Sequence, residues 1–270
     1  MIAHLQAHYG FSRTPFGREL APGMLHRHDA HNQAAARLTW CIQQRALGVL
    51  TGEVGAGKTV ALPAAFSAPD QSRHALIYLP NPSVGVRGIH HAVVAAPGGV
   101  PRTHHATLVP QALDAIANEQ AEPGRTPILA IDEAHMLQPP QLEAVRMLTN
   151  HDLDSASPMA CLLIGQPKLR RDIKLGILAA LDQRIAMRYV MDAMTRDETT
   201  SYIHHHVKLA GRNDTLFADD AVELIHNTGR GLPRTINNLA VQALLAAYAD
   251  RKAIADLAST RIAVNEITTD

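Results

Sequence analysis

The sequence predicts an α/β fold, with a parallel five-stranded sheet followed by a smaller part made only of helices. A glycine-rich segment that ends in lysine and threonine, residues 52–59, comes directly after an apolar strand pattern. Five apolar runs alternate with helical patterns along residues 46–190, which is typical of a parallel sheet with helices on both faces. Beyond this region only helical patterns remain. We therefore expect an α/β core with an N-terminal extension over residues 1–192 and a helical lid over residues 193–270.

The five predicted strands are short, apolar and rich in β-branched or aliphatic residues. They are residues 46–51, 74–79, 127–131, 159–164 and 185–190. The helical patterns around them are residues 30–45, 59–66, 107–120, 140–150 and 168–183. Pro63 falls inside the second of these helices, where it removes a backbone donor and costs about 3 kcal/mol. We therefore expect that helix to be short or bent.

The glycine-rich segment has the spacing of a phosphate-binding loop, the Walker A motif. It contains, in order, Gly52, Glu53, Val54, Gly55, Ala56, Gly57, Lys58 and Thr59. Glycines allow the positive φ angles that turn successive N–H groups toward phosphate oxygens, and the following helix adds its positive end. We expect Lys58 to reach the β- and γ-phosphates of ATP and Thr59 to ligate Mg²⁺. A glycine-rich turn that binds nothing is the alternative, but all four signature positions are filled after a strand.

A second motif supports the first. The predicted strand 127–131 ends in two adjacent carboxylates, Asp132 and Glu133, as in a Walker B motif. At the carboxyl edge of a parallel sheet, Asp132 can hold Mg²⁺ and Glu133 can orient or deprotonate the attacking water. Two acids after a strand can also simply begin a helix. Together with the loop, however, they predict ATP hydrolysis rather than binding alone. A strand lies between the loop strand and this one, as in the branch of phosphate-loop folds that uses a catalytic glutamate.

Composition limits the partners and the compartment. The 270 residues carry no formal net charge, so contact with nucleic acid would need a local basic cluster. Aromatic residues make up 4%, which leaves few side chains for stacking on single-stranded bases. Cys41 and Cys161 lie in apolar stretches and are expected to be buried free thiols. We find neither a signal-peptide core nor a run of about 18 apolar residues, and we expect a cytoplasmic protein without a membrane partner.

The C-terminal part carries helix-start signals. Thr195 and Glu198 form a capping box, and Pro233 can open a later helix at its first turn. Arg234 then lies at a helix start, where the helix dipole does not favour a cation. We expect an anion to compensate this arginine.

At this point the chain resembles the AAA+ ATPases, and more narrowly the bacterial group that includes the secretion ATPase ExeA and the TniB/TnsC ATPase subunits of transposition systems. The likeness extends over nearly the whole chain. Besides the two Walker motifs, it rests on residues 9–11, 14–17, 165–167, 181–185 and 231–239.

The resemblance implies roles for further residues. Gln166 matches the sensor-1 position that helps to place the attacking water, and Arg234 matches sensor 2, which approaches the γ-phosphate from the lid. Arg184 is the first candidate for the arginine finger that enters the neighbouring subunit's site, and Arg188 is the second. The alternative for each is a surface or packing role. The resemblance also implies self-association into a ring or a helical assembly.

Three functions follow. The first is an ATPase that assembles on duplex DNA and recruits or regulates a transposase. Its candidates for contact with DNA phosphates are Arg87, Lys168, Arg170, Arg171 and Lys174. These side chains can equally form an ordinary exposed face of a helix. The second is an ExeA-like secretion ATPase; such proteins carry a membrane span and a wall-binding region beyond the lid, whereas this chain stops at Asp270. The third is a nucleotide-dependent protein scaffold, against which the intact Glu133 argues.

Overall fold

The computed structural model describes residues 2–17, 20–66, 74–122, 125–150 and 157–268. These residues form two compact units. The α/β unit comprises residues 31–53 and 58–191, and the helical unit comprises residues 1–30, 54–57 and 192–270. Each unit has its own cluster of buried apolar side chains.

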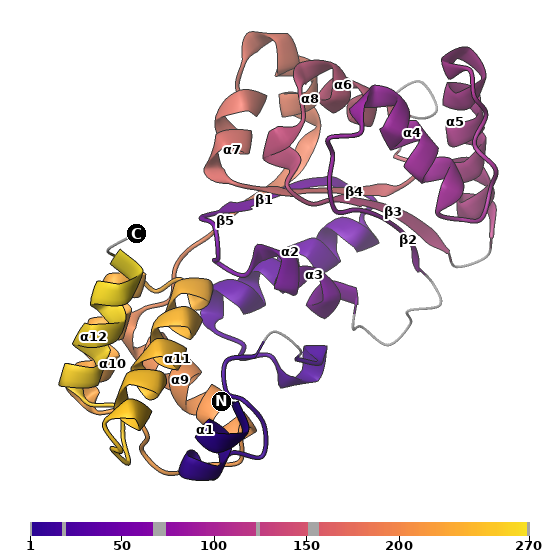
Figure 1. The fold of residues 1–270 in the computed structure, drawn as a ribbon. Helices are drawn as coiled ribbons and strands as arrows, with labels where there is room; N and C mark the ends of the chain where they lie inside the picture. The colour runs from indigo at the N-terminus through magenta and orange to yellow at the C-terminus, as the bar shows by residue number, and fades with distance from the viewer. Residues whose placement is uncertain (1, 18–19, 67–73, 123–124, 151–156, 269–270) are drawn as a thin grey trace. The chain divides into compact units, whose positions relative to one another are not determined.

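The α/β unit is built on a five-stranded sheet, drawn in Figure 1. Its strands are β1 (Leu47–Gly52), β2 (His74–Leu79), β3 (Thr126–Ile131), β4 (Ala160–Gly165) and β5 (Ile185–Met191). They lie in the order β2-β3-β4-β1-β5, and every pair is parallel. All six residues of β1 and of β4 are buried, as expected for strands covered on both faces. The predicted fold class is therefore confirmed.

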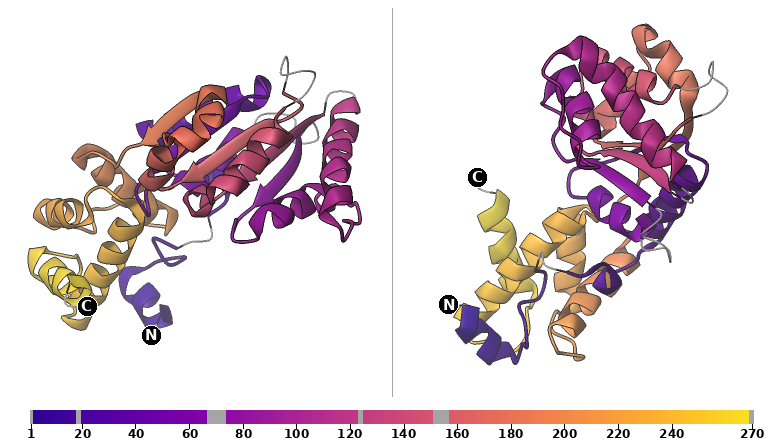
Figure 2. Two further views of the ribbon diagram at one scale, coloured as in Figure 1. Left: turned by 90° about the horizontal axis from the view of Figure 1, so that it is seen from above. Right: turned by 90° about the vertical axis from the view of Figure 1, so that its right-hand side faces the viewer.

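Helices cover both faces of this sheet (Figures 1 and 2), with α2 and α3 on one face and α4, α6, α7 and α8 on the other. The helices are α2 (Asp29–Gln43), α3 (Lys58–Phe66), α4 (Gly85–Ala95), α5 (His105–Ala121), α6 (Pro139–Leu148), α7 (Pro167–Ile173) and α8 (Ala179–Arg184). The 3-10 turns η3 (Ala134–Met136) and η5 (Gly176–Leu178) also belong to this unit, whereas η1 (Pro22–Met24) belongs to the helical unit. Pro63 lies inside α3, which is only nine residues long.

The predicted helices differ from the structure in two places. The single helix predicted over residues 168–183 is divided into α7, η5 and α8, because Leu175 takes an extended conformation before Gly176. The helix α4 has no counterpart among the predictions. Gly85 and Gly88 lower its helix propensity, and it is held by its buried face, which includes Ile89 and Val93.

The helical unit contains α1 (Ile2–Tyr9), α9 (Arg196–Leu209), α10 (Asp219–Gly229), α11 (Pro233–Ala249) and α12 (Leu257–Thr268). The N-terminal segment contributes Tyr9, Phe11 and Phe16 to its core. The Tyr9 hydroxyl donates a hydrogen bond to the carbonyl of Leu244 at 3.1 Å. The chain's first residues are therefore part of this unit.

Two features fix the starts of these helices, and the first of them is predicted from the sequence. Thr195 and Glu198 form the capping box of α9. Before α11, Gly231 has φ +68°, and a Cβ atom there would lie 2.1 Å from the carbonyl oxygen of Met194. Only glycine tolerates this close approach, so Gly231 sets the turn that places Arg234 in the first turn of α11.

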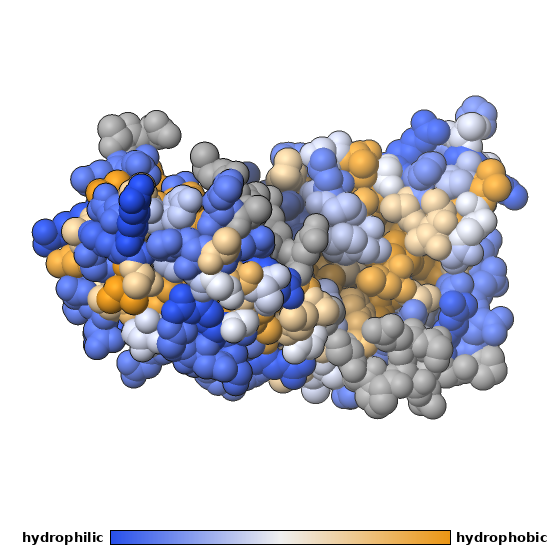
Figure 3. Space-filling view, turned by 60° about the horizontal axis from the view of Figure 1, so that its bottom comes forward, coloured by the Kyte–Doolittle hydropathy of each residue, from blue (hydrophilic) through white to orange (hydrophobic). Residues whose placement is uncertain are grey.

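The surface is mixed in character. Figure 3 shows apolar residues gathered on part of the surface of the α/β unit, among polar ones. Leu76 and Tyr78 of β2 are among this unit's exposed apolar side chains. Cys41 and Cys161 are free and buried, as predicted. None of the helices that the structure describes combines the length and the apolar character that a membrane span requires.

The core of the helical unit contains a histidine, His206, that should make folding pH-dependent. His206 is 3% exposed and stacks on Phe16, with ring centroids 5.1 Å apart. Burial, followed by the charges of His205, His26 and Arg13, lowers its pKa to about 4. An unfolded histidine titrates near pH 6.5, so between these values the unfolded chain binds more protons than the folded one.

We expect the free energy of unfolding to fall by about 3 kcal/mol as the pH drops from 7 to below 4, since each pKa unit is worth about 1.4 kcal/mol. Urea denaturation at several pH values measures this. The variant His206→Gln should lose less of its stability over the same range, whereas His204→Gln, exposed on the same helix, should behave as the wild type. Equal acid sensitivity of all three proteins would contradict the assignment to His206.

Candidate active site

The phosphate loop joins β1 to α3. Gly55 and Gly57 have φ angles of +84° and +90°, which a side-chain-bearing residue rarely adopts. Lys58 begins α3 and is only 8% exposed. Its Nζ donates hydrogen bonds to the carbonyls of Gly52 and Glu53, each at 2.8 Å. The ammonium group is therefore held at the loop, where it can meet a phosphate.

Asp132 is the centre of a hydrogen-bonded group at the carboxyl edge of the sheet. It is 6% exposed, and its Oδ2 accepts a hydrogen bond from Thr59 Oγ1 at 2.8 Å and one from the Tyr78 hydroxyl at 3.2 Å. Its Oδ1 accepts the backbone N–H of Glu133 at 2.8 Å. The structure thus brings the Walker A threonine and the Walker B aspartate together, although they are 73 residues apart.

This group suits Mg²⁺. A carboxylate and a hydroxyl oxygen are hard ligands, and magnesium sites in proteins commonly use one or two carboxylates with waters and substrate phosphates. Asp132 Oδ2 already faces two hydroxyl hydrogens, which are positive partners that a cation can replace. Thr59 and Asp132 are therefore compatible with the ligand roles expected of them.

Tyr78 is a site residue that sequence reasoning missed. Burial, followed by the charge of Asp132 and the hydrogen bond to it, raises the pKa of Tyr78 to about 12. The phenol therefore remains a hydrogen-bond donor at neutral pH. The register pairs Tyr78 with Ala130, two residues before Asp132 on the neighbouring strand, and a sequence without strand order does not reveal this pairing.

Glu133 takes the left-handed conformation, with φ +51°, which is uncommon for a residue other than glycine and is often found at functional sites. Its Oε2 lies 3.3 Å from Nδ1 of His135. The same Nδ1 lies 3.4 Å from the backbone nitrogen of Gln166, at the start of α7. One ring nitrogen cannot donate to Glu133 and accept from Gln166 at once. Only one of the two contacts is therefore a hydrogen bond, and which one it is depends on whether Nδ1 carries a hydrogen.

His135 is the second residue that sequence reasoning missed. The signal is its position in the run Asp132-Glu133-Ala134-His135, directly after the Walker B carboxylates. Its Nδ1 lies within reach of both Glu133 and Gln166, so the predicted catalytic base and the predicted sensor 1 lie in one small group.

The two arginine-finger candidates have partners within their own subunit. Arg184, at the end of α8, donates to Thr149 Oγ1 at 3.3 Å and to Asn150 Oδ1 at 3.0 Å. Arg188, on β5, donates to Asp182 Oδ1 at 2.7 Å. These contacts do not involve the phosphate loop or Asp132. Their roles in a neighbouring subunit's site stay predictions.

Arg234 lies beside the loop's tip within the helical unit. Residues 54–57 group with this unit, and the backbone N–H of Arg234 donates to the carbonyl of Gly55 at 3.3 Å. A Cβ atom on Gly55 would be 2.9 Å from Cβ of Arg234, so the contact is close. The sensor-2 role of Arg234 stays a prediction.

Comparisons with known proteins agree with this geometry. Residues 42–173 match the family model of the AAA domain. Over 246 residues, or 89% of this chain, the sequence is 30% identical to General secretion pathway protein A of Aeromonas hydrophila. The match covers 44% of that relative, so the chain spans less than half of its length.

Solved structures share the fold at lower identity. The Aeropyrum pernix ORC2 protein in its ADPNP-ADP complexes has a TM-score of 0.69 and 16% identity, and the alignment covers 94% of this chain and 71% of that chain. Cdc6p from Pyrobaculum aerophilum has a TM-score of 0.70 and 16% identity, with 93% and 70% covered. The Thermotoga maritima RuvB Holliday junction branch migration motor has a TM-score of 0.57 and 17% identity, with 88% and 70% covered.

The parallel sheet and the loop between β1 and α3 define a P-loop NTPase, a class of nucleotide-binding proteins. The AAA-domain match over residues 42–173 and the 30% identical relative support, more narrowly, an AAA+ ATPase. The narrower resemblance to the TniB/TnsC transposition subunits stays a prediction.

Proposed function

We propose that this chain binds Mg²⁺-ATP at residues 52–59 and hydrolyses it to ADP and phosphate, with Glu133 acting on the attacking water. The observation that carries the proposal is the cluster in which Asp132 accepts hydrogen bonds from Thr59 Oγ1 and the Glu133 backbone. It places the metal-ligand candidates directly beside a half-exposed carboxylate, Glu133.

Each residue has a distinct task in this proposal. Lys58 binds the β- and γ-phosphates, and Thr59 and Asp132 hold Mg²⁺, which neutralises phosphate charge when bound. Glu133 orients the water and accepts its proton, while His135 limits where the Glu133 carboxylate can lie. Gln166 helps to place the same water.

Two arginines complete the proposed site. Arg234 approaches the γ-phosphate from the lid, and Arg184 acts in trans on the neighbour's nucleotide, with Arg188 as the other candidate. An arginine finger that acts on a neighbour's nucleotide requires the chain to associate with copies of itself, in a ring or a helical assembly.

At the level of biological role, we propose an ATPase that acts on a protein partner in a nucleotide-dependent way, as a counterpart of General secretion pathway protein A. The similarity over 89% of this chain supports this reading. The sequence offers this role as an alternative. The nucleotide-dependent scaffold differs from it only in that ATP hydrolysis has no effect on the partner.

The second candidate is an ATPase that assembles on duplex DNA and recruits or regulates a transposase. Arg170 and Arg171 are exposed on α7 and favour it. Two other members of the basic cluster are already engaged, since Lys168 pairs with Asp172 at 3.8 Å and Lys174 with Asp182 at 3.0 Å. These pairs weaken the cluster as a phosphate-binding surface.

Steady-state ATP hydrolysis with and without duplex DNA separates the two candidates. We expect DNA to change the rate less than about twofold, because the formal net charge is zero and part of the basic cluster is paired. The rate should disappear in Lys58→Ala and fall by about 100-fold or more in Glu133→Gln. A strong stimulation by DNA that both variants abolish would instead support the transposition-type role.

A further inference from the structure

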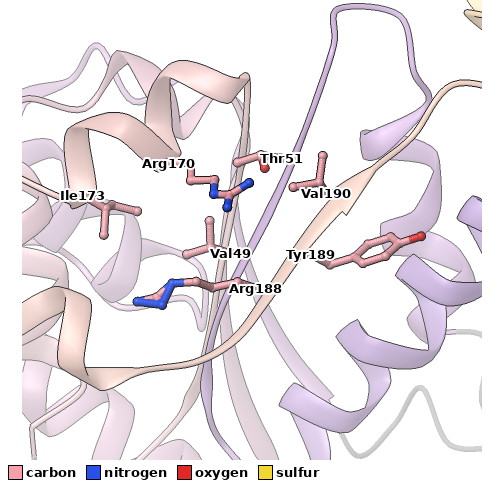
Figure 4. A pocket seen from close by; sticks show the side chains of 7 residues that line it. All are labelled: Val49, Thr51, Arg170, Ile173, Arg188, Tyr189 and Val190. Carbon is pink, nitrogen blue, oxygen red and sulfur yellow. The ribbon is translucent and has the colours of Figure 1, made fainter.

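A pocket of about 130 Å³ lies between α7 and the strands β1 and β5 (Figure 4). It is lined by Val49, Thr51, Arg170, Ile173, Arg188, Tyr189 and Val190. All of these residues belong to the α/β unit. Arg188 is also the second candidate for the arginine finger, whereas the other lining residues have no role in the ATPase mechanism proposed above.

The two arginines of the pocket differ in their pairing. Arg188 Nη2 donates to both the carbonyl and the carboxylate of Asp182, at 2.5 and 2.7 Å. The side chain of Arg170 forms no hydrogen bond or ion pair with the residues that the structure describes. Figure 4 shows its side chain reaching from α7 toward β1, and both Arg170 and Thr51 line the pocket. The pocket therefore holds one guanidinium group available to an anion.

The size and the walls of the pocket restrict that anion. Pockets for cofactors and drug-sized ligands measure about 300–1,000 Å³, so a nucleotide is too large for this one. A single water needs only about 10–15 Å³ of such volume, so the pocket can hold a whole side chain. Val49, Ile173 and Val190 provide apolar walls. A glutamate, with an aliphatic stem and a terminal carboxylate, matches both the walls and the guanidinium fork.

The position beside β5 indicates how such a glutamate would arrive. In the sheet order, β5 is an outer strand with β1 as its neighbour on the inner side. An outer strand presents backbone groups that an added extended segment can pair with. Alternate residues of that segment would share a sheet face with Arg188 and Val190, since side chains alternate along a strand. Val190 is 39% exposed and can meet an aliphatic residue there.

We propose that this pocket is a docking site for an extended acidic segment of a protein partner, which adds to the edge of β5 and places a glutamate against Arg170. An aliphatic residue two positions from the glutamate packs on Val190. A DNA backbone does not meet these requirements, because its phosphates offer no apolar group for the walls. The proposal does not depend on ATP hydrolysis, because neither Arg170 nor the apolar walls take part in the ATPase mechanism proposed above.

Methyl NMR on the full chain tests the proposal. The probes are the peptide acetyl-Thr-Glu-Thr-Val-Thr-amide and the same peptide with glutamine in place of glutamate. We expect saturable shifts of the Val49, Ile173 and Val190 methyls, and about tenfold or more weaker binding of the glutamine peptide, because a charge-assisted pair is lost. Arg170→Ala should remove this preference, whereas Arg171→Ala, exposed on the same helix but outside the pocket, should retain it.

Two results with the peptides, and a third with DNA, would overturn the proposal. One is equal binding of the two peptides to the wild type, and the other is shifts confined to methyls outside the pocket. Competition by duplex DNA for the same methyls would assign the arginines to nucleic acid instead. Arg170→Lys provides a second variant, which keeps the charge but loses the planar fork and should bind the glutamate peptide with intermediate affinity.

Discussion

Replacing Glu133 by glutamine is expected to lower the rate of ATP hydrolysis by about 100- to 1,000-fold while changing ATP affinity less than about threefold. The amide keeps the size of the side chain and its reach to His135, but it cannot accept the proton of the attacking water. General base catalysis typically contributes rate factors of about 10²–10⁴. Single-turnover hydrolysis gives the rate, and titration with a fluorescent nucleotide gives the affinity.

The matched control is Glu143→Gln on α6. Glu143 forms a surface pair with Arg146, and such pairs contribute little to stability or to a distant site. This variant should hydrolyse ATP as the wild type does. If Glu133→Gln also kept its rate, the chain would be a nucleotide-dependent scaffold in which hydrolysis is incidental.

The strands and the loop could be predicted because their signals are local. Fully buried parallel strands are continuous apolar runs, and all five predicted strands agree with β1–β5 to within one residue at each end. The Walker A spacing is itself a local pattern, in which glycines occupy the positions that need positive φ. The sequence predicts that Thr59 and Asp132 belong to one metal site, because each lies in a motif that follows a strand and both strands belong to one parallel sheet.

The rest of the site depends on register and on packing, which a single sequence does not show. Tyr78 reaches Asp132 only because β2 pairs with β3 in one register. His135 reaches Glu133 because Glu133 takes a left-handed turn. The free guanidinium group of Arg170 is visible only once the partners of Lys168, Lys174 and Arg188 are known.

Replacing Lys58 by alanine is expected to weaken ATP binding by about 30- to 100-fold and to abolish measurable turnover. A charge-assisted hydrogen bond contributes about 1.5–3 kcal/mol, and Lys58 is placed to make such bonds with two phosphates. In the structure its Nζ also binds the carbonyls of Gly52 and Glu53, so the variant loses a contact that shapes the loop. Isothermal titration with ATP, in the presence of Mg²⁺, measures the affinity.

The alanine variant of the exposed Lys208 on α9 is the control and should bind ATP as the wild type does. Comparison with Glu133→Gln then separates the two roles. Both variants should lose turnover, but only Lys58→Ala should lose nucleotide affinity, because in the proposed site the lysine holds the phosphates and the glutamate acts only on the attacking water. Full ATP affinity in Lys58→Ala would show that the nucleotide does not bind at residues 52–59, and the proposed site would be wrong.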